Sequence, residues 1–319
     1  MPGEFDLIRR RFTRTVSHTD LGVGDDGALF SPRPGMQMVV STDMLVSGTH
    51  FFADVEPELL GWKAAAVNIS DMAAMGAEPR WMLLALSLPS VRDDWVAELA
   101  SGFHSCCAGF AVDWVGGDTT RGPLNLCPTV IGEVPQGQAI LRDGARAGDD
   151  IWVSGAPGLA ALGLRALQGT VQLDAGWRAR CLSALQRPAP RVALGVGLRL
   201  LASAALDVSD GLSGDLMHIL ERSGVSAVLS DEHLPLAPLM AACGDEALAR
   251  EVFLSGGDDY ELLFTAPVAQ RAQVEALSLR LALPLARIGR IEAGSPRIEL
   301  ARADGSRQVL SARGFDHFS

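Results

Sequence analysis

Aspartates recur along this chain at the ends of short apolar runs and inside glycine-rich turns. Between Leu21 and His50, Asp25 and Asp26 lie in a glycine-rich bend, and Asp43 ends a predicted strand. Later aspartates in similar turns or in a helical pattern are Asp71, Asp118, Asp207, Asp210, Asp258 and Asp259. Aspartates at strand ends and in glycine turns can converge on one cleft, where they must bind cations or shift their pKa values. The pattern predicts a fold that gathers carboxylates from distant segments into a magnesium and phosphate site.

The chain is long enough for two domains of ordinary size or for one large domain. It has 319 residues, of which 48% are hydrophobic and 20% are charged, as in ordinary globular proteins. No apolar run approaches the length of a membrane span, and charged residues interrupt the N-terminal segment where a signal peptide would be apolar. We therefore expect a cytoplasmic protein that does not interact with a membrane.

Charge and cysteine content exclude several classes of protein. The five cysteines are scattered and form no Cys-x-x-Cys motif, which argues against a disulfide framework and a zinc site. The net charge of −11 repels nucleic acids, so we expect no nucleic-acid partner. The same charge would repel a nucleotide phosphate unless divalent cations lie between the two. An acidic chain with an anionic substrate therefore implies a metal ion.

Hydrophobic periodicity predicts a mixed fold in two parts. In the first part the predicted helices are 4–17, 58–75 and 93–110, and the predicted strands are 81–88, 111–115 and 124–134. Because these elements do not strictly alternate, they suggest an α+β unit. The turn-rich segment 142–149 is the predicted boundary, which gives an N-terminal domain at 1–143 and a C-terminal α/β domain at 144–319.

Oxygen-bearing side chains in these contexts supply the ligands that Mg²⁺ requires. Hard divalent cations prefer oxygen ligands and keep part of their water shell, and substrate phosphates can complete the coordination. The predicted metal ligands are Asp26, Ser41, Thr42, Asp43, Asp71, Asp118, Asp207 and Asp210. Each of them alone could be a turn or cap residue, and Asp71 could instead form a salt bridge with Arg80. Their number and shared context support the metal site.

Familiar phosphate-binding motifs are absent from the sequence. The chain lacks a Gly-x-x-x-x-Gly-Lys-Ser/Thr loop, and its only lysine, Lys63, lies in a helical pattern. It also lacks the His-Arg-Asp and Asp-Phe-Gly motifs of protein kinases. Asp25 and Asp26 occupy positions where a dinucleotide loop would approach a pyrophosphate. The remaining interpretation is phosphoryl transfer in which bound metal ions supply most of the catalysis.

Several motifs in a fixed order resemble those of the thiamine-monophosphate kinase family. The motifs are Gly24-Asp25-Asp26, Ser41-Thr42-Asp43, His50 and the segments 66–77, 116–122, 207–212 and 255–262. This family is related to aminoimidazole ribonucleotide synthetase and selenophosphate synthetase. The resemblance implies an N-terminal domain whose mixed sheet forms a barrel with that of a second subunit, hence a homodimer. It also implies a C-terminal α/β domain, with ATP bound between the two domains.

The resemblance also implies a role for individual residues. It gives the eight predicted metal ligands as magnesium ligands, among which we assign Asp43, Asp71 and Asp210 to catalysis. It implies that ATP is contacted by Gly117, Asp118, Arg142 and Ser209. It implies that thiamine monophosphate is contacted by His50, Asp258 and Phe315. Asp258 stands where relatives often carry Glu.

The expected reaction is phosphorylation of thiamine monophosphate by ATP, with direct in-line transfer assisted by Mg²⁺. Two alternatives are consistent with the residues. One is another ATP-dependent enzyme of the same superfamily, similar to aminoimidazole ribonucleotide synthetase. The other is a nucleotide-sensing or metal-sensing protein without catalytic activity on the same scaffold.

Overall fold

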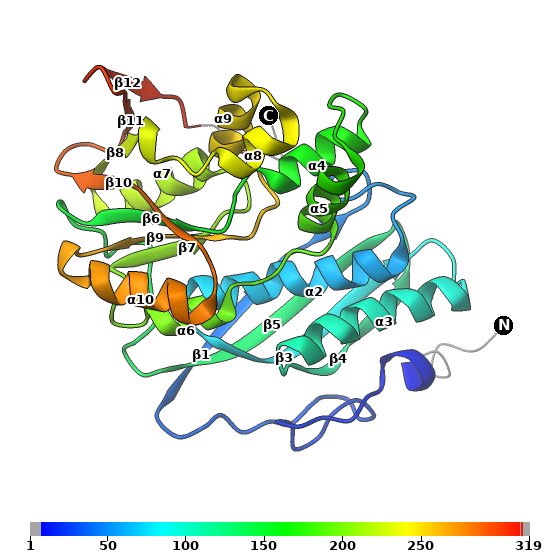
Figure 1. The fold of residues 1–319 in the computed structure, drawn as a ribbon. Coiled ribbons are helices and arrows are strands. Elements are labelled where there is room, and N and C mark those ends of the chain that lie inside the picture. Colours follow the sequence, from blue (N-terminus) through cyan, green and yellow to red (C-terminus); the bar gives the residue numbers. More distant parts are fainter. Residues whose placement is uncertain (1–7, 313, 315–319) are drawn as a thin grey trace. The chain divides into compact units, whose positions relative to one another are not determined.

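The chain folds into two compact units of mixed helices and strands (Figure 1). The computed structural model describes residues 8–312 and 314. Unit 1 comprises Met1–Met72 and Ala77–Gly137, and unit 2 comprises Ala73–Gly76 and Gln138–Ser319. The division between Gly137 and Gln138 thus precedes the predicted boundary at 143/144. Ile140 is buried in the core of unit 2, and its N–H donates to the Met75 carbonyl oxygen over 3.1 Å. None of the helices in the described ranges is long and apolar enough to span a membrane.

Unit 1 is built on a mixed five-stranded sheet with the order β1-β5-β3-β4, in which β2 also pairs with β5. The strands are β1 (Met36–Thr42), β2 (Leu45–Val46), β3 (Glu78–Leu88), β4 (Asp113–Arg121) and β5 (Asn125–Pro135). Strand β5 is antiparallel to its neighbours, whereas β3 and β4 are parallel. The parallel pair is joined through a helix, as a crossover between parallel strands requires.

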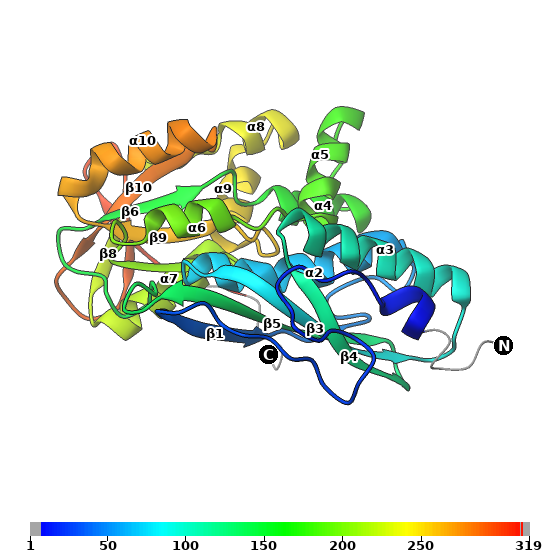
Figure 2. The ribbon, with the colours of Figure 1, turned by 90° about the horizontal axis from the view of Figure 1, so that it is seen from below.

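Two long helices of unit 1 lie side by side on the sheet (Figure 2). They are α2 (Pro57–Ala74) and α3 (Asp93–Gly109), and both match the predicted helices to within one residue at each end. The two backbones approach closely at paired glycines. A Cβ on Gly61 would lie 2.0 Å from the Leu99 carbonyl oxygen, and one on Gly102 would lie 1.8 Å from that of Glu58. Glycine is therefore required at both positions.

The predicted helix at 4–17 is wrong over its described part. Only a π-helical turn, η1 (Ile8–Phe12), is present, and residues 1–7 lie outside the described residues. The Asp113 carboxylate accepts hydrogen bonds from the N–H groups of Ser17 and His18 and from the Thr19 hydroxyl. These bonds hold residues 17–19, at the end of the predicted helix, in an irregular conformation, because backbone donors that pair with a distant carboxylate do not continue a helix.

Unit 2 contains a seven-stranded sheet with the order β12-β11-β8-β10-β6-β9-β7. Its strands are β6 (Asp150–Ser154), β7 (Ala204–Asp207), β8 (Ser226–Ser230), β9 (Leu262–Ala266), β10 (Leu285–Glu292), β11 (Ile298–Ala301) and β12 (Arg307–Leu310). Its helices are α4 (Leu159–Leu167), α5 (Ala175–Gln186), α6 (Val192–Leu198), α7 (Leu212–Ser223), α8 (Ala237–Cys243), α9 (Glu246–Ser255) and α10 (Arg271–Leu281). Two 3₁₀ turns, η2 (Asp231–His233) and η3 (Val268–Gln270), complete the unit.

Both faces of this sheet are covered by helices (Figure 1). Along β6, Ile151 and Val153 pack with residues of α7 and α9, whereas Trp152 packs with residues of α6 and α10. Side chains alternate between the faces of a strand, so a strand that is buried on both faces is apolar throughout. The continuous apolar run Ile151-Trp152-Val153 therefore belongs in the interior of an α/β unit.

Candidate active site

A cavity of about 950 Å³ in unit 1 brings together two of the predicted site segments. The glycine-rich loop 22–28 lines one part of it, and residues 114–119 of β4 line another. Asp26, Gly117 and Asp118 are all among the lining residues, and both aspartates are exposed. The cavity therefore brings together two predicted metal ligands, Asp26 and Asp118, and two predicted ATP contacts, Gly117 and again Asp118.

Local backbone geometry forms both walls of this cavity. Leu21 and Leu29 form an antiparallel bridge with hydrogen bonds of 3.0 and 2.8 Å, which closes the loop that carries Asp26. Gly117 has a φ of +146°, and a Cβ there would lie 1.9 Å from the Leu84 carbonyl oxygen. Only glycine meets both conditions. Asp118 lies within β4, not after a strand as the sequence analysis predicted, because β4 continues to Arg121.

A second group of predicted ligands lies where β1 ends beside α2. The Ser41 hydroxyl donates to Asp71 Oδ2 over 2.6 Å, and the Asp43 N–H donates to Asn68 Oδ1 over 3.0 Å. Thr42 donates to the Pro128 carbonyl oxygen over 2.7 Å, which holds β1 to β5. Asn68 is fully buried and connects the two elements, and the sequence analysis assigned it no role.

Arg80, the alternative salt-bridge partner predicted for Asp71, forms its ion pair with a different carboxylate. Arg80 Nε lies 3.5 Å from Glu133 Oε2, a carboxylate that also accepts hydrogen bonds from Arg33. Asp71, which is half-buried on α2, accepts a hydrogen bond from the Ser41 hydroxyl. A carboxylate and a hydroxyl oxygen in contact form an all-oxygen donor set of the kind that Mg²⁺ prefers.

His50 closes a tight turn after β2. Its Nδ1 accepts a hydrogen bond from the Val46 N–H over 2.9 Å. Because Nδ1 is the acceptor, a neutral His50 ring carries its proton on Nε2. The turn therefore fixes both the orientation and the tautomer of the side chain predicted to contact the substrate.

In unit 2, one carboxylate organises the turn that carries Ser209 and Asp210. Asp215, in the first turn of α7, accepts hydrogen bonds from the N–H groups of Ser209, Asp210 and Gly211, each over 3.1 Å. Burial, together with the nearby Asp210 and Asp207 carboxylates, raises the pKa of Asp215 to about 7. Negative charge is thus concentrated where β7 ends, and a bound cation there would relieve the repulsion. The sequence analysis missed Asp215, although an acidic residue in the first turn of a helix signals such a role.

The loop that carries Asp258 is joined to this turn by backbone hydrogen bonds. The N–H of Asp258 donates to the Ser209 carbonyl oxygen over 2.8 Å, and that of Tyr260 donates to the Val208 carbonyl oxygen over 2.9 Å. These bonds extend the antiparallel pairing of β7 with β9 beyond both strands. Asp258 and Tyr260 have φ values of +69° and +52°, which non-glycine residues rarely adopt. The surrounding contacts therefore impose the shape of this loop.

Two further acidic side chains anchor the same loop: Asp259, one of the aspartates predicted from the sequence to converge, and Glu261, which had no predicted role. Asp259 accepts hydrogen bonds from the N–H groups of Gly158 and Ala160 at the start of α4, over 2.6 and 3.1 Å. Glu261 accepts hydrogen bonds from Ser154 and Arg191, with Arg191 Nε at 2.7 Å. A side chain at Gly155 would collide with Glu261, at 1.8 Å from its Oε1. The loop is thus anchored at two positions directly after Asp258.

Two predicted contacts remain, Arg142 and Phe315. Arg142 is exposed, and its carbonyl oxygen accepts a hydrogen bond from the Ser223 hydroxyl over 3.0 Å. Phe315 lies outside the described residues. A Cβ on the preceding Gly314 would lie 3.4 Å from the Cβ of Asp210, so residue 314 borders the turn with Asp210.

The structure brings the predicted ligands together in separate groups. Asp26 and Asp118 line one cavity, Ser41 is hydrogen-bonded to Asp71, and Asp207 and Asp210 flank one turn of unit 2. Within residues 8–312 and 314, no three His, Cys, Asp or Glu side chains form a group that could hold a metal ion. Convergence of all eight ligands on one cleft stays a prediction.

Comparison with known proteins identifies the family. Residues 24–134 match the family described as AIR synthase related protein, N-terminal domain. The chain is 40% identical over 321 residues to the thiamine-monophosphate kinase of Salmonella typhimurium. The aligned region covers 99% of this chain and 98% of that protein. The chain belongs to the thiamine-monophosphate kinase family. The resemblance stated from the sequence motifs is thereby confirmed.

Solved structures of thiamine-monophosphate kinases share this fold. The crystal structure of the enzyme from Stenotrophomonas maltophilia K279a has a TM-score of 0.82 and 46% identity, and the match covers 91% of this chain and 92% of that one. The structure of AaThiL complexed with AMPPCP and TMP has a TM-score of 0.78 and 31% identity, and the match covers 99% of this chain and 97% of that one. Membership of the thiamine-monophosphate kinase family therefore extends over both units.

Proposed function

We propose that this protein transfers the γ-phosphoryl group of ATP to the phosphate of thiamine monophosphate, which gives thiamine diphosphate and ADP. The observation that carries the proposal is the 40% identity over 99% of the chain to a thiamine-monophosphate kinase. The AaThiL complex supports it, because that protein is similar over 99% of this chain and binds TMP together with AMPPCP, an analogue of ATP.

The chemistry requires positioning and charge neutralisation more than proton transfer. The second pKa of a phosphate monoester is about 6, so the attacking oxygen is largely deprotonated at neutral pH. The obstacle is repulsion between two anions, on the order of 4 kcal/mol for each pair of unit charges at about 4 Å and an effective dielectric constant of about 20. Mg²⁺, when bound, would offset this repulsion and stabilise the charge on the transferring group.

The residues of the chain have separate tasks in this proposal. The metal would be held by Asp26, Ser41, Thr42, Asp43, Asp71, Asp118, Asp207 and Asp210, whose oxygen-only donor set suits a hard cation. Gly117, Asp118, Arg142 and Ser209 would contact ATP, and His50, Asp258 and Phe315 would contact thiamine monophosphate. The hydrogen bond between Ser41 and Asp71 and the fixed tautomer of His50 support these roles.

We also propose that unit 1 is the core of a domain for metal binding, ATP binding and dimerisation, and that its sheet continues into a barrel with a second copy. Met38 and Val40 are two residues apart in β1, so their side chains lie on the same face of the sheet. Their exposed fractions are 38% and 63%. A second subunit would bury these apolar side chains. A dimer mass in light scattering would support the arrangement, and a monomer at micromolar concentration would contradict it. The expected cytoplasmic location stays a prediction.

The activity is tested by incubating the full chain with ATP, Mg²⁺ and thiamine monophosphate and measuring ADP and thiamine diphosphate. We expect equal amounts of the two products, and no ADP above background without thiamine monophosphate or with excess EDTA. Binding of both substrates without turnover would instead favour a sensor. ADP formation that does not depend on thiamine monophosphate would indicate a different acceptor.

A further inference from the structure

Arginine side chains surround a second cavity, which lies entirely within unit 2. Its volume is about 470 Å³, and no predicted metal, ATP or substrate contact lines it. The polar side chains around it include Arg271, Arg287, Arg290, Arg307, Ser230 and His233. Four arginines around one cavity are unexpected in a chain with a net charge of −11.

The register of the sheet places two of these arginines, Arg287 and Arg290, on one face. Arg287 pairs with Trp152 across β10 and β6, and Arg290 pairs with both Asp150 and Val228. Residues that pair directly across neighbouring strands point to the same face of a sheet. Trp152 packs with residues of α6 and α10, so Arg287 and Arg290 belong to that same face.

Arg287 is only weakly paired within the described structure. The buried Asp150 carboxylate accepts hydrogen bonds from Nε and Nη2 of Arg271, so both of its oxygens are engaged. Arg287 Nη1 lies 3.5 Å from Asp150 Oδ1, beyond ordinary hydrogen-bonding distance for a charged pair. Its side chain is 40% exposed. The Arg287 guanidinium can therefore bind an additional anionic group.

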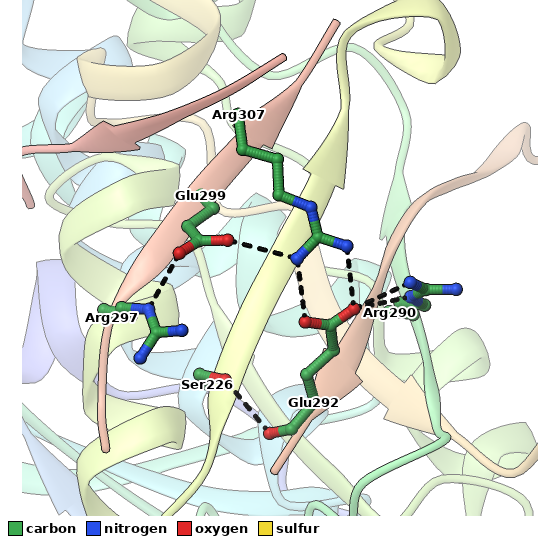
Figure 3. A network of polar contacts seen from close by, with 6 residues as sticks. All are labelled: Ser226, Arg290, Glu292, Arg297, Glu299 and Arg307. Atoms are coloured by element: carbon green, nitrogen blue, oxygen red, sulfur yellow. Dashed lines mark hydrogen bonds and ion pairs between the residues drawn. The ribbon is translucent and has the colours of Figure 1, made fainter. Parts of the chain in front are cut away.

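Two of the arginines that line the cavity, Arg290 and Arg307, belong to a network of ion pairs (Figure 3). Arg307 donates to both Glu292 and Glu299, Arg290 donates to Glu292 over 2.7 Å, and Arg297 donates to Glu299 over 2.9 Å. The carboxylates of Asp150, Glu292 and Glu299 are thus paired with five arginines in and around the cavity, and the Glu275 carboxylate also acts on Arg271. The network fixes Arg290 and Arg307 in place and leaves positive charge in excess.

We propose that this cavity is a second ligand site, for a small molecule that carries a phosphate or diphosphate group. The planar guanidinium donates two parallel hydrogen bonds to phosphate oxygens, and several arginines together favour an anion of charge −2 or more over a single carboxylate. The volume falls within the range of small-molecule sites, about 300–1,000 Å³. Ser230 and His233 add hydrogen-bonding groups to the lining.

Inorganic diphosphate is the probe, and calorimetric titration of the full chain in EDTA is the measurement. The test variant is Arg287→Gln, which lines the cavity, and the matched control is Arg297→Gln, which belongs to the same network but does not line it. Diphosphate that binds at the active site contributes equally in all three proteins. We expect Arg287→Gln to weaken the cavity component by about tenfold or more and Arg297→Gln to leave it nearly unchanged.

Amide shifts locate the binding, because Gly148 and Gly289 both line the cavity. Diphosphate should shift both signals in the wild type and not in Arg287→Gln. Identical isotherms for the three proteins, or absence of these shifts at about 10 mM diphosphate, would overturn the proposal and leave a solvated ion-pair network. If Arg287→Gln does not fold, Arg290→Gln replaces it, since that side chain is 60% exposed.

Discussion

The backbone N–H of Asp258 donates to the carbonyl oxygen of Ser209 over 2.8 Å. The first residue belongs to the loop proposed to contact thiamine monophosphate, and the second belongs to the turn proposed to contact ATP. Asp259 and Asp215 anchor the loop and the turn, respectively, to the starts of α4 and α7. A displacement of either segment is thus transmitted to the other through the backbone.

We therefore expect Gly257→Ala to impair the use of both substrates. A Cβ at this position would lie 2.4 Å from the Ser209 carbonyl oxygen and would force the two segments apart. Since small misplacements of reacting groups can cost on the order of 100-fold in rate, we expect kcat/KM to fall for ATP and for thiamine monophosphate. Steady-state kinetics would measure both. Gly109→Ala is the control, because a Cβ there meets nothing within 4 Å. A loss confined to one substrate would contradict the coupling.

Replacement of Asp215 should affect stability as well as turnover. Asp215→Ala leaves the N–H groups of Ser209, Asp210 and Gly211 without their common acceptor, so we expect the free energy of unfolding to fall by about 2–4 kcal/mol. Asp215→Asn keeps one acceptor oxygen, so its free energy of unfolding should fall by less. Urea denaturation measures the free energy of unfolding of the wild type and of each variant. The control Asp245→Ala removes an exposed N-cap to Leu248 and should cost about 1 kcal/mol. Equal losses in the two alanine variants would argue against an organising role for Asp215.

Asp43→Ala tests the proposed metal site. The side chain is exposed at the end of β1, whereas the hydrogen bond to Asn68 uses the backbone N–H, which alanine retains. We therefore expect an unchanged melting temperature and a kcat lower by a factor of about 100 or more. The control Asp94→Ala removes another exposed carboxylate, on α3, and should keep full activity. A kcat of Asp43→Ala near the wild-type value would refute the assigned role.

The five cysteines should separate into two reactive and three protected thiols. Cys127 and Cys243 are partly exposed, whereas Cys106, Cys107 and Cys181 are buried. Burial raises the pKa of Cys181 to about 11, so its thiolate becomes the major species only above that pH. A chromogenic disulfide reagent at pH 8 should titrate two thiols in the native protein and five after denaturation. The rate at Cys181 should rise with pH, because the thiolate is the reacting form. Rapid reaction of more than two native thiols at pH 8 would contradict the described packing.

The periodicity of the sequence predicted the long elements well. Helices α2 and α3 and strands β3 and β5 appear close to their predicted positions. In β5 buried and partly buried side chains alternate over most of the strand, with the period of a strand, whereas residues 63–70 of α2 are all buried. The predicted helix at 4–17 is limited in its described part to the turn Ile8–Phe12, and at its end a distant side chain, Asp113, accepts hydrogen bonds from the backbone N–H groups of Ser17 and His18. Local sequence carries no information about such a partner.

The sequence by itself determined the family, the acidic and glycine-rich segments and the oxygen-rich ligand set, since these are properties of residue type and order. Only the tertiary structure placed Ser41 against Asp71 and joined Asp258 to Ser209. It also gave Asp215, Asp259 and Arg287 their neighbours. The physical reason is that hydrogen bonds and charge pairs form between atoms within a few ångströms of each other, and the fold brings residues far apart in the chain to that distance.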